Sequence, residues 1–167
     1  MLFSSDDPFR GSWHGALPSG RAERDALIQQ AFGDLLPWGL GVNIDLFHCD
    51  PARVCDTDGL QSFVLALYDT LGMPHSGDPL LAHFSEEREA PCISLVQVLG
   101  KSLLWGHFLE GDAAVCLHLF AGDPYPPYQT AAFCQQWFAA RDVNVLVQFR
   151  GPQKAAFGYL FAEEGEH

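Results

Sequence analysis

The chain has 167 residues, of which 48% are hydrophobic and 18% are charged, so it is long and apolar enough to fill one compact core. Nine basic residues against 21 acidic ones give a net charge of −12, which argues against nucleic acid or an anionic membrane surface as a partner. No apolar run reaches the roughly 20 residues that span a bilayer, and residues 1–13 lack a signal-peptide pattern, so we expect a cytoplasmic protein.

Residues 1–37 are predicted to be an N-terminal extension with one helix from Arg21 to Leu36, which ends at Pro37. The main domain is predicted to span residues 38–167. It begins with a strand, because apolar and other residues alternate from Val42 to Leu46.

The next predicted element is an amphipathic helix. Asp56 or Thr57 can cap its start, apolar residues recur at helical spacing as far as Leu71, and Gly72 is placed to end it. Residues 73–91 contain prolines, glycines and a run of charges, and are predicted to form a long loop or an irregular edge.

Three apolar stretches joined by short turns then predict a meander of antiparallel strands: Cys92–Leu99, Ser102–Leu109 and Ala113–Phe120. A helix over about 128–140 and a strand over 143–149 complete the chain. This order of elements predicts an α+β fold, a two-layer sandwich in which helices cover one face of an antiparallel sheet. The aromatic residues expected in its core are Trp105, Phe108, Phe133, Trp137 and Phe138.

The five cysteines are odd in number, scattered and without a CxxC pair, so we expect reduced thiols and no structural zinc. Cys116 and His118 lie two apart on one predicted strand and therefore share a face. Two ligands without a third do not make a metal site, and none is predicted.

Several residues together resemble the bacterial S-adenosylmethionine decarboxylase proenzymes. They are the segment 41–51, the spacing of Ser94, Ser102 and His107, and the segment 110–115 that follows. The resemblance covers about residues 39–151. It implies the same fold and a lyase that cuts its own chain, a zymogen, to make a pyruvoyl cofactor.

By this resemblance the chain is cut between Lys101 and Ser102, and Ser102 becomes the pyruvoyl group. His107 is the base that assists cleavage, and Ser94 helps near the scissile bond. The Ser102 hydroxyl attacks the Lys101 carbonyl to give an ester, and removal of the serine α-proton eliminates that ester; the dehydroalanine left behind hydrolyses to pyruvoyl and ammonia. The pyruvoyl carbonyl then forms a Schiff base with an amino-acid substrate and withdraws electrons as carbon dioxide leaves.

The sequence departs from the family pattern at two places. Lys101 stands where the family usually has glutamate, and segment 120–122 (Phe-Ala-Gly) lacks the family's proton-donating cysteine. Cys116 is the candidate to replace it if the strand runs at a different register. Glu110 and Asp45 are the candidate substrate-binding residues, Asp45 because it is polar in the middle of an apolar strand.

Strand geometry constrains this picture. In a straight strand Ser102 and His107 face opposite sides of the sheet, so they can converge only through a kink or bulge. Gly106 is where a kink is least costly, so convergence of Ser102 and His107 would require one there.

The leading hypothesis is a pyruvoyl-dependent decarboxylase of S-adenosylmethionine in polyamine (spermidine) biosynthesis. Two alternatives stay open: a related decarboxylase of ornithine or arginine, or an uncleaved, non-catalytic homologue that binds a ligand or partner. A small cationic amino acid suits the acidic composition. The resemblance also implies a homo-oligomer.

Overall fold

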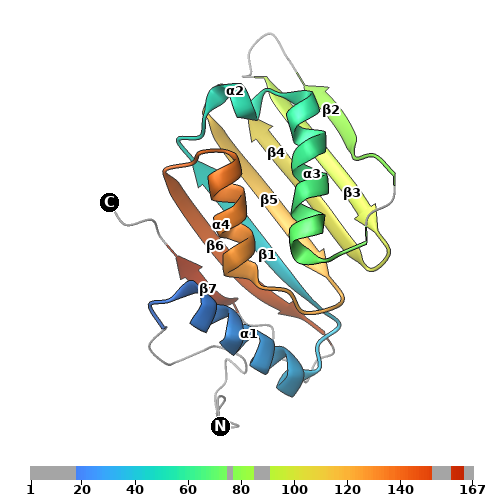
Figure 1. The fold of residues 1–167 in the computed structure, drawn as a ribbon, viewed down its shortest axis with the longest axis vertical. Coiled ribbons are helices and arrows are strands. Elements are labelled where there is room, and N and C mark those ends of the chain that lie inside the picture. Colours follow the sequence, from blue (N-terminus) through green and yellow to red (C-terminus); the bar gives the residue numbers. More distant parts are fainter. Residues whose placement is uncertain (1–17, 75–76, 85–90, 152–158, 164–167) are drawn as a thin grey trace.

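The computed structural model describes residues 18–74, 77–84, 91–151 and 159–163, and its described elements form a seven-stranded sheet with four helices (Figure 1). In chain order the elements are α1 (Arg21–Leu35), β1 (Gly39–Phe47), α2 (Pro51–Val54), α3 (Thr57–Leu71), β2 (Leu80–Phe84), β3 (Cys92–Leu99), β4 (Ser102–Leu109), β5 (Ala114–Ala121), α4 (Pro127–Trp137), β6 (Asp142–Arg150) and β7 (Tyr159–Glu163).

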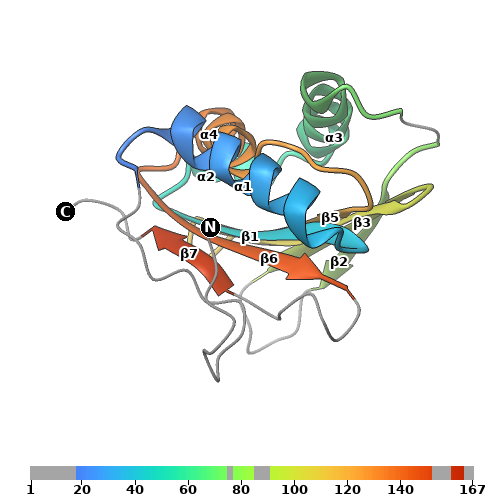
Figure 2. The same ribbon diagram turned by 90° about the horizontal axis from the view of Figure 1, so that it is seen from below.

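The strand order is β2-β3-β4-β5-β1-β6-β7, and every neighbouring pair is antiparallel. All four helices lie on one face of this sheet (Figure 2). We call the other side the open face. The predicted α+β sandwich with helices on one face is therefore confirmed.

The core lies between the sheet and its helices. Alternate residues of the central strands point to the helix side and are almost fully buried, as Val42, Leu104 and Leu119 illustrate. The cap residues predicted for α3 are confirmed: the Asp56 carboxylate accepts from the Gly59 amide at 3.0 Å, and Gly72 ends the helix with φ of 64°.

Helix α1 packs on the start of α4 and contributes Ile28 and Ala31 to the same core. The carboxylate of Asp25, only 2% exposed, accepts from the backbone amides of Tyr128 and Gln129 at 2.8 and 3.0 Å. These amides belong to the first turn of α4, which has no capping side chain of its own, so a residue from α1 acts as its cap. Burial raises the pKa of this Asp25 carboxyl, and the two backbone hydrogen bonds oppose that shift.

Some elements differ from the sequence predictions. Segment 73–91, predicted to be a long loop or an irregular edge, contains the edge strand β2, and β7 extends the sheet beyond the last predicted strand. The charged run 86–89 lies outside the described residues, as do residues 1–17. Helix α4 ends at Trp137, because Phe138 leaves the helical conformation and Ala139 has φ of 50°. The prediction that Trp105 is a core residue is wrong, because its side chain is 38% exposed on the open face.

The kink at Gly106 that convergence of Ser102 and His107 would require is not found. Strand β4 pairs continuously with both neighbours, and no register shift interrupts it. Gly106 is buried on the helix side, where a Cβ would lie 2.6 Å from Leu117 Cδ2 and 2.9 Å from the Cys116 carbonyl oxygen. The glycine therefore allows close packing of β5 against β4 and does not bend the strand.

Gly106→Ala is expected to lower the free energy of unfolding by about 1–3 kcal/mol, because the added methyl group has to push backbone aside. Urea denaturation would measure this. Gly33→Ala is the matched control, because no atom lies within 4 Å of its added Cβ and Ala is the better helix former. If both variants lost the same stability, the close packing at Gly106 would be refuted.

Candidate functional site

Strand register brings four of the predicted site residues into one row on the open face. Ser94 on β3 pairs with His107 on β4, His107 pairs with Cys116 on β5, and Cys116 pairs with Asp45 on β1. Directly paired residues share a face, with Cβ atoms about 4.5–5.5 Å apart. We call Ser94, His107, Cys116 and Asp45 the polar row.

Interactions within the polar row link neighbouring strands. The hydroxyl of Ser94 lies 2.8 Å from His107 Nδ1, within hydrogen-bond distance. At the other end the Asp45 carboxylate faces the Cys116 thiol. Burial, followed by the charge and hydrogen bonding of Asp45, raises the pKa of Cys116 to about 11. The thiol therefore keeps its proton at neutral pH, as a proton donor must.

A second row lies beside the first and was missed as a site from the sequence. Trp105, His118 and Asn43 are directly paired on β4, β5 and β1. The Trp105 and His118 rings stack at 5.4 Å, and His118 Nδ1 lies against Asn43 Oδ1. The pKa of His118 is lowered mainly by burial and also by the nearby positive charge of Arg150. Both effects favour the neutral ring. Strand alternation could have predicted this second row, because its residues are two positions from His107, Cys116 and Asp45 and therefore share their face of the sheet.

Ser102 lies away from the polar row. It begins β4, next to the two-residue turn of Gly100 and Lys101, and it faces the helix side. His107 is five positions further along a straight strand, which corresponds to about 16 Å. Because Ser102 and His107 are on opposite faces, they do not meet within one chain.

A cavity of about 430 Å³ adjoins Ser102 at this end of the sheet. The end of α3 and the segment after β5 form its walls, with Met73, Lys101 and Asp123 among the lining residues. The peptide bond between Lys101 and Ser102 therefore borders a space large enough for a small ligand.

Glu110 also lies outside the polar row, in the turn after β4. There its carboxylate interacts with the Cys55 thiol. The pKa of Cys55 is raised mainly by burial and to a smaller extent by the hydrogen bond and negative charge of Glu110. Across the described parts of the chain, no group of three or more His, Cys, Asp and Glu residues could hold a metal ion. Within the same residues no helix is long and apolar enough to cross a membrane.

Alkylation of Cys116 tests the polar row. With a thiol pKa of about 11, the rate should rise about tenfold per pH unit from pH 8 to 10. Asp45→Asn should lower that pKa and speed the reaction at pH 8, because it removes a negative charge that disfavours the thiolate. Mass spectrometry of iodoacetamide-treated protein would follow the Cys116 peptide. An unchanged rate in Asp45→Asn would contradict the contact.

Comparisons with known proteins agree with this architecture. The sequence model of the family described as S-adenosylmethionine decarboxylase matches residues 41–151. The chain belongs to the S-adenosylmethionine decarboxylase family. The structure is also similar to the crystal structure of the adenosylmethionine decarboxylase from Aquifex aeolicus, with a TM-score of 0.57 and 13% identity over 70% of this chain and 92% of that one. None of the curated proteins matches the sequence.

The family's pyruvoyl group can be compared with the residues present in this S-adenosylmethionine decarboxylase family member. Such a group needs a serine next to a tight turn and beside a space for substrate. Ser102 meets this requirement, because it is half-buried beside a cavity and follows a turn in which Gly100 has φ of 55°. A proton-donating thiol is available at Cys116, although on the open face. Ser102 therefore fits as the precursor, whereas His107 and Cys116, the candidate base and acid, lie on the other side of the sheet.

Proposed function

We propose that this family member processes itself at Ser102 and decarboxylates S-adenosylmethionine in the polyamine pathway, in the cytoplasm. The hydrogen-bonded Ser94 and His107 pair carries the proposal. A histidine that contacts a hydroxyl partner on an accessible sheet face can act as a general acid or base. The pyruvoyl group would supply the electron-withdrawing carbonyl.

The separation of Ser102 and His107 adds a requirement. Since the two residues do not meet in one chain, we propose that a second copy supplies the polar row that acts on Ser102, so that the active protein is a homo-oligomer. In such an assembly the open face of one copy has to pack against the end of the sheet that carries Ser102 in the other; on that open face Val98 is 63% exposed and Trp105 38%. Covering these side chains would remove apolar surface from water.

In this arrangement each residue has a defined task. The Ser102 hydroxyl attacks the carbonyl carbon of Lys101, and His107 accepts the serine α-proton while Ser94 holds the imidazole ring in place. Cys116, kept protonated by its half-buried position and by Asp45, returns a proton after carbon dioxide leaves.

A second candidate function is that of an uncleaved, non-catalytic homologue that binds a ligand or partner. The distance between Ser102 and His107 within one chain favours it, as does Lys101 at the position of the family's glutamate. The cavity beside Ser102 would then bind without reaction.

Intact-mass measurement of the purified protein decides between these functions. The decarboxylase proposal expects two fragments, residues 1–101 and 102–167, and the non-catalytic alternative expects one chain of 18.4 kDa. For cleaved protein, carbon dioxide release from carboxyl-labelled S-adenosylmethionine, ornithine and arginine identifies the substrate. Release from ornithine or arginine alone would replace the proposed substrate.

A further inference from the structure

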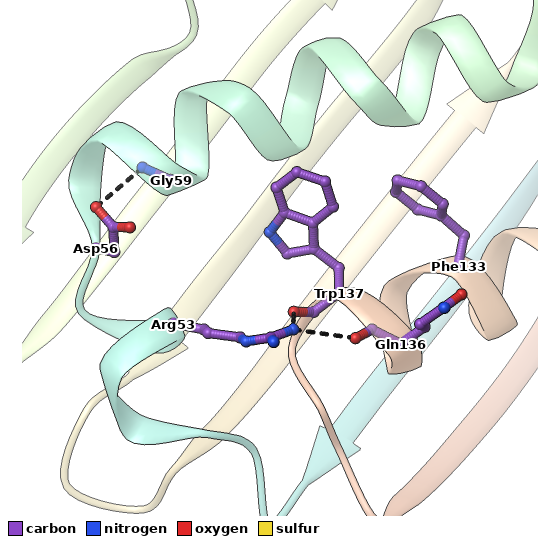
Figure 3. A pocket seen from close by; sticks show the side chains of 6 residues that line it. All are labelled: Arg53, Asp56, Gly59, Phe133, Gln136 and Trp137. Atoms are coloured by element: carbon purple, nitrogen blue, oxygen red, sulfur yellow. Dashed lines mark hydrogen bonds between the residues drawn. The ribbon is translucent and has the colours of Figure 1, made fainter.

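A cleft of about 520 Å³ lies on the helix side of the sheet, between the start of α3 and the end of α4 (Figure 3). Its volume is within the range of about 300–1,000 Å³ that is usual for small-molecule sites. Six residues line it: Arg53, Asp56, Gly59, Phe133, Gln136 and Trp137. The polar row lies on the opposite face and takes no part in it.

Local hydrogen bonds fix the two polar walls of this cleft. The Asp56 carboxylate accepts from the Gly59 amide through Oδ1, which holds it at the start of α3. The Arg53 guanidinium donates through Nη1 to the carbonyl oxygens of Gln136 and Trp137, at the end of α4. A Cβ at Gly59 would collide with the Asp56 carboxylate, so the glycine keeps this wall in place.

Aromatic rings form the apolar wall. Phe133 and Trp137 are half-buried at the cleft, and both contact the fully buried Phe63, at 6.2 and 5.8 Å between ring centroids. In Figure 3 Asp56 and Phe133 lie on opposite sides of the Trp137 ring, and the Arg53 guanidinium lies below it, at the backbone of Trp137 and Gln136. A planar group placed on these rings would have the Asp56 carboxylate at one end and the Arg53 guanidinium along one edge.

The charges that remain for a ligand have opposite signs. Asp56 uses Oδ1 for its helix cap, so Oδ2 can accept a hydrogen bond from a cation. Arg53 donates through Nη1 to the last carbonyl oxygens of α4, and its Nε lies 3.6 Å from Asp50 Oδ2. The Nη2 hydrogens can therefore donate to an anion.

We infer that this cleft binds an aromatic α-amino acid. The α-ammonium pairs with Asp56, the α-carboxylate accepts from Arg53, and the ring lies on Trp137 and Phe133. Each part of the zwitterion thus meets a group of matching chemistry.

Titrations with L-phenylalanine, phenethylamine and 3-phenylpropionate test this inference, because the two analogues each lack one charged group. Binding followed by NMR of the full chain should be tightest for L-phenylalanine. Asp56→Asn keeps a good helix cap but removes the charge. It should weaken the binding of L-phenylalanine about tenfold and leave the affinity for 3-phenylpropionate unchanged. Asp58→Asn is the matched control, since Asp58 is in the same helical turn but does not line the cleft.

Three results would overturn the inference: no binding of L-phenylalanine, binding of 3-phenylpropionate as tight as that of L-phenylalanine, or equal effects of Asp56→Asn and Asp58→Asn. Processing at Ser102 is measured separately by mass, so the cleft and the proposed function fail or succeed independently.

Discussion

A Ser102→Ala variant is expected to remain a single chain of 18.4 kDa, whereas the proposed function expects the unaltered protein to split into residues 1–101 and 102–167. The acyl shift begins with the serine hydroxyl, and alanine has none, so the loss of cleavage and of decarboxylation should be complete. Intact mass after prolonged incubation measures the result. Circular dichroism should show an unchanged fold, because Ser102 begins its strand and is only half-buried.

Lys101→Glu is the matched variant at the same peptide bond. The acyl shift needs the carbonyl of residue 101 and not its side chain, so this variant should still be cleaved. Continued splitting of Ser102→Ala would refute the assignment of Ser102. A wild-type chain that never splits would instead establish the non-catalytic alternative.

Co-expression of two inactive variants tests the requirement for a second copy. Ser102→Ala retains His107, and His107→Ala retains Ser102, so a mixed assembly contains one complete set of groups. We expect the His107→Ala chain to be cleaved when both are present and to stay intact alone. Cleavage of His107→Ala on its own at the normal rate would show that His107 is not the base.

Phe63→Ala is expected to cost about 3–5 kcal/mol of unfolding free energy, the largest stability effect that we predict. Phe63 is on α3 and is fully buried. Its ring centroid lies 4.9 Å from that of Phe138 and 6.2 Å from that of Phe133. Removing it leaves a cavity among rings that the surrounding helices cannot fill without moving. Urea denaturation followed by circular dichroism measures the loss.

Leu65→Ala provides the comparison, because Leu65 is on the same helix but 41% exposed. Its loss should be much smaller, since little of its surface leaves water on folding. A Phe63→Ala variant as stable as Leu65→Ala would contradict the packing of α3 against α4.

Much of the candidate site could be predicted from local patterns. Alternation along a strand places Cys116 and His118 on one face, and a charged residue within an otherwise largely apolar strand marks Asp45. The partner of each residue across the sheet could not be read in this way. The contact between Cys116 and Asp45 joins strands about 70 positions apart in sequence, and it depends on β1 entering the sheet between β5 and β6.

The sequence by itself determined the elements that have strong local signals: the α3 helix with a cap at Asp56 or Thr57 and its Gly72 end, the strand meander, and the family to which the chain belongs. Only the tertiary structure decided that Gly106 packs closely instead of bending its strand, and that Ser102 and His107 lie on opposite faces. Periodicity and capping act over a few residues and are visible in the sequence. Strand register and the atoms that surround a glycine arise from segments that meet only in the folded chain.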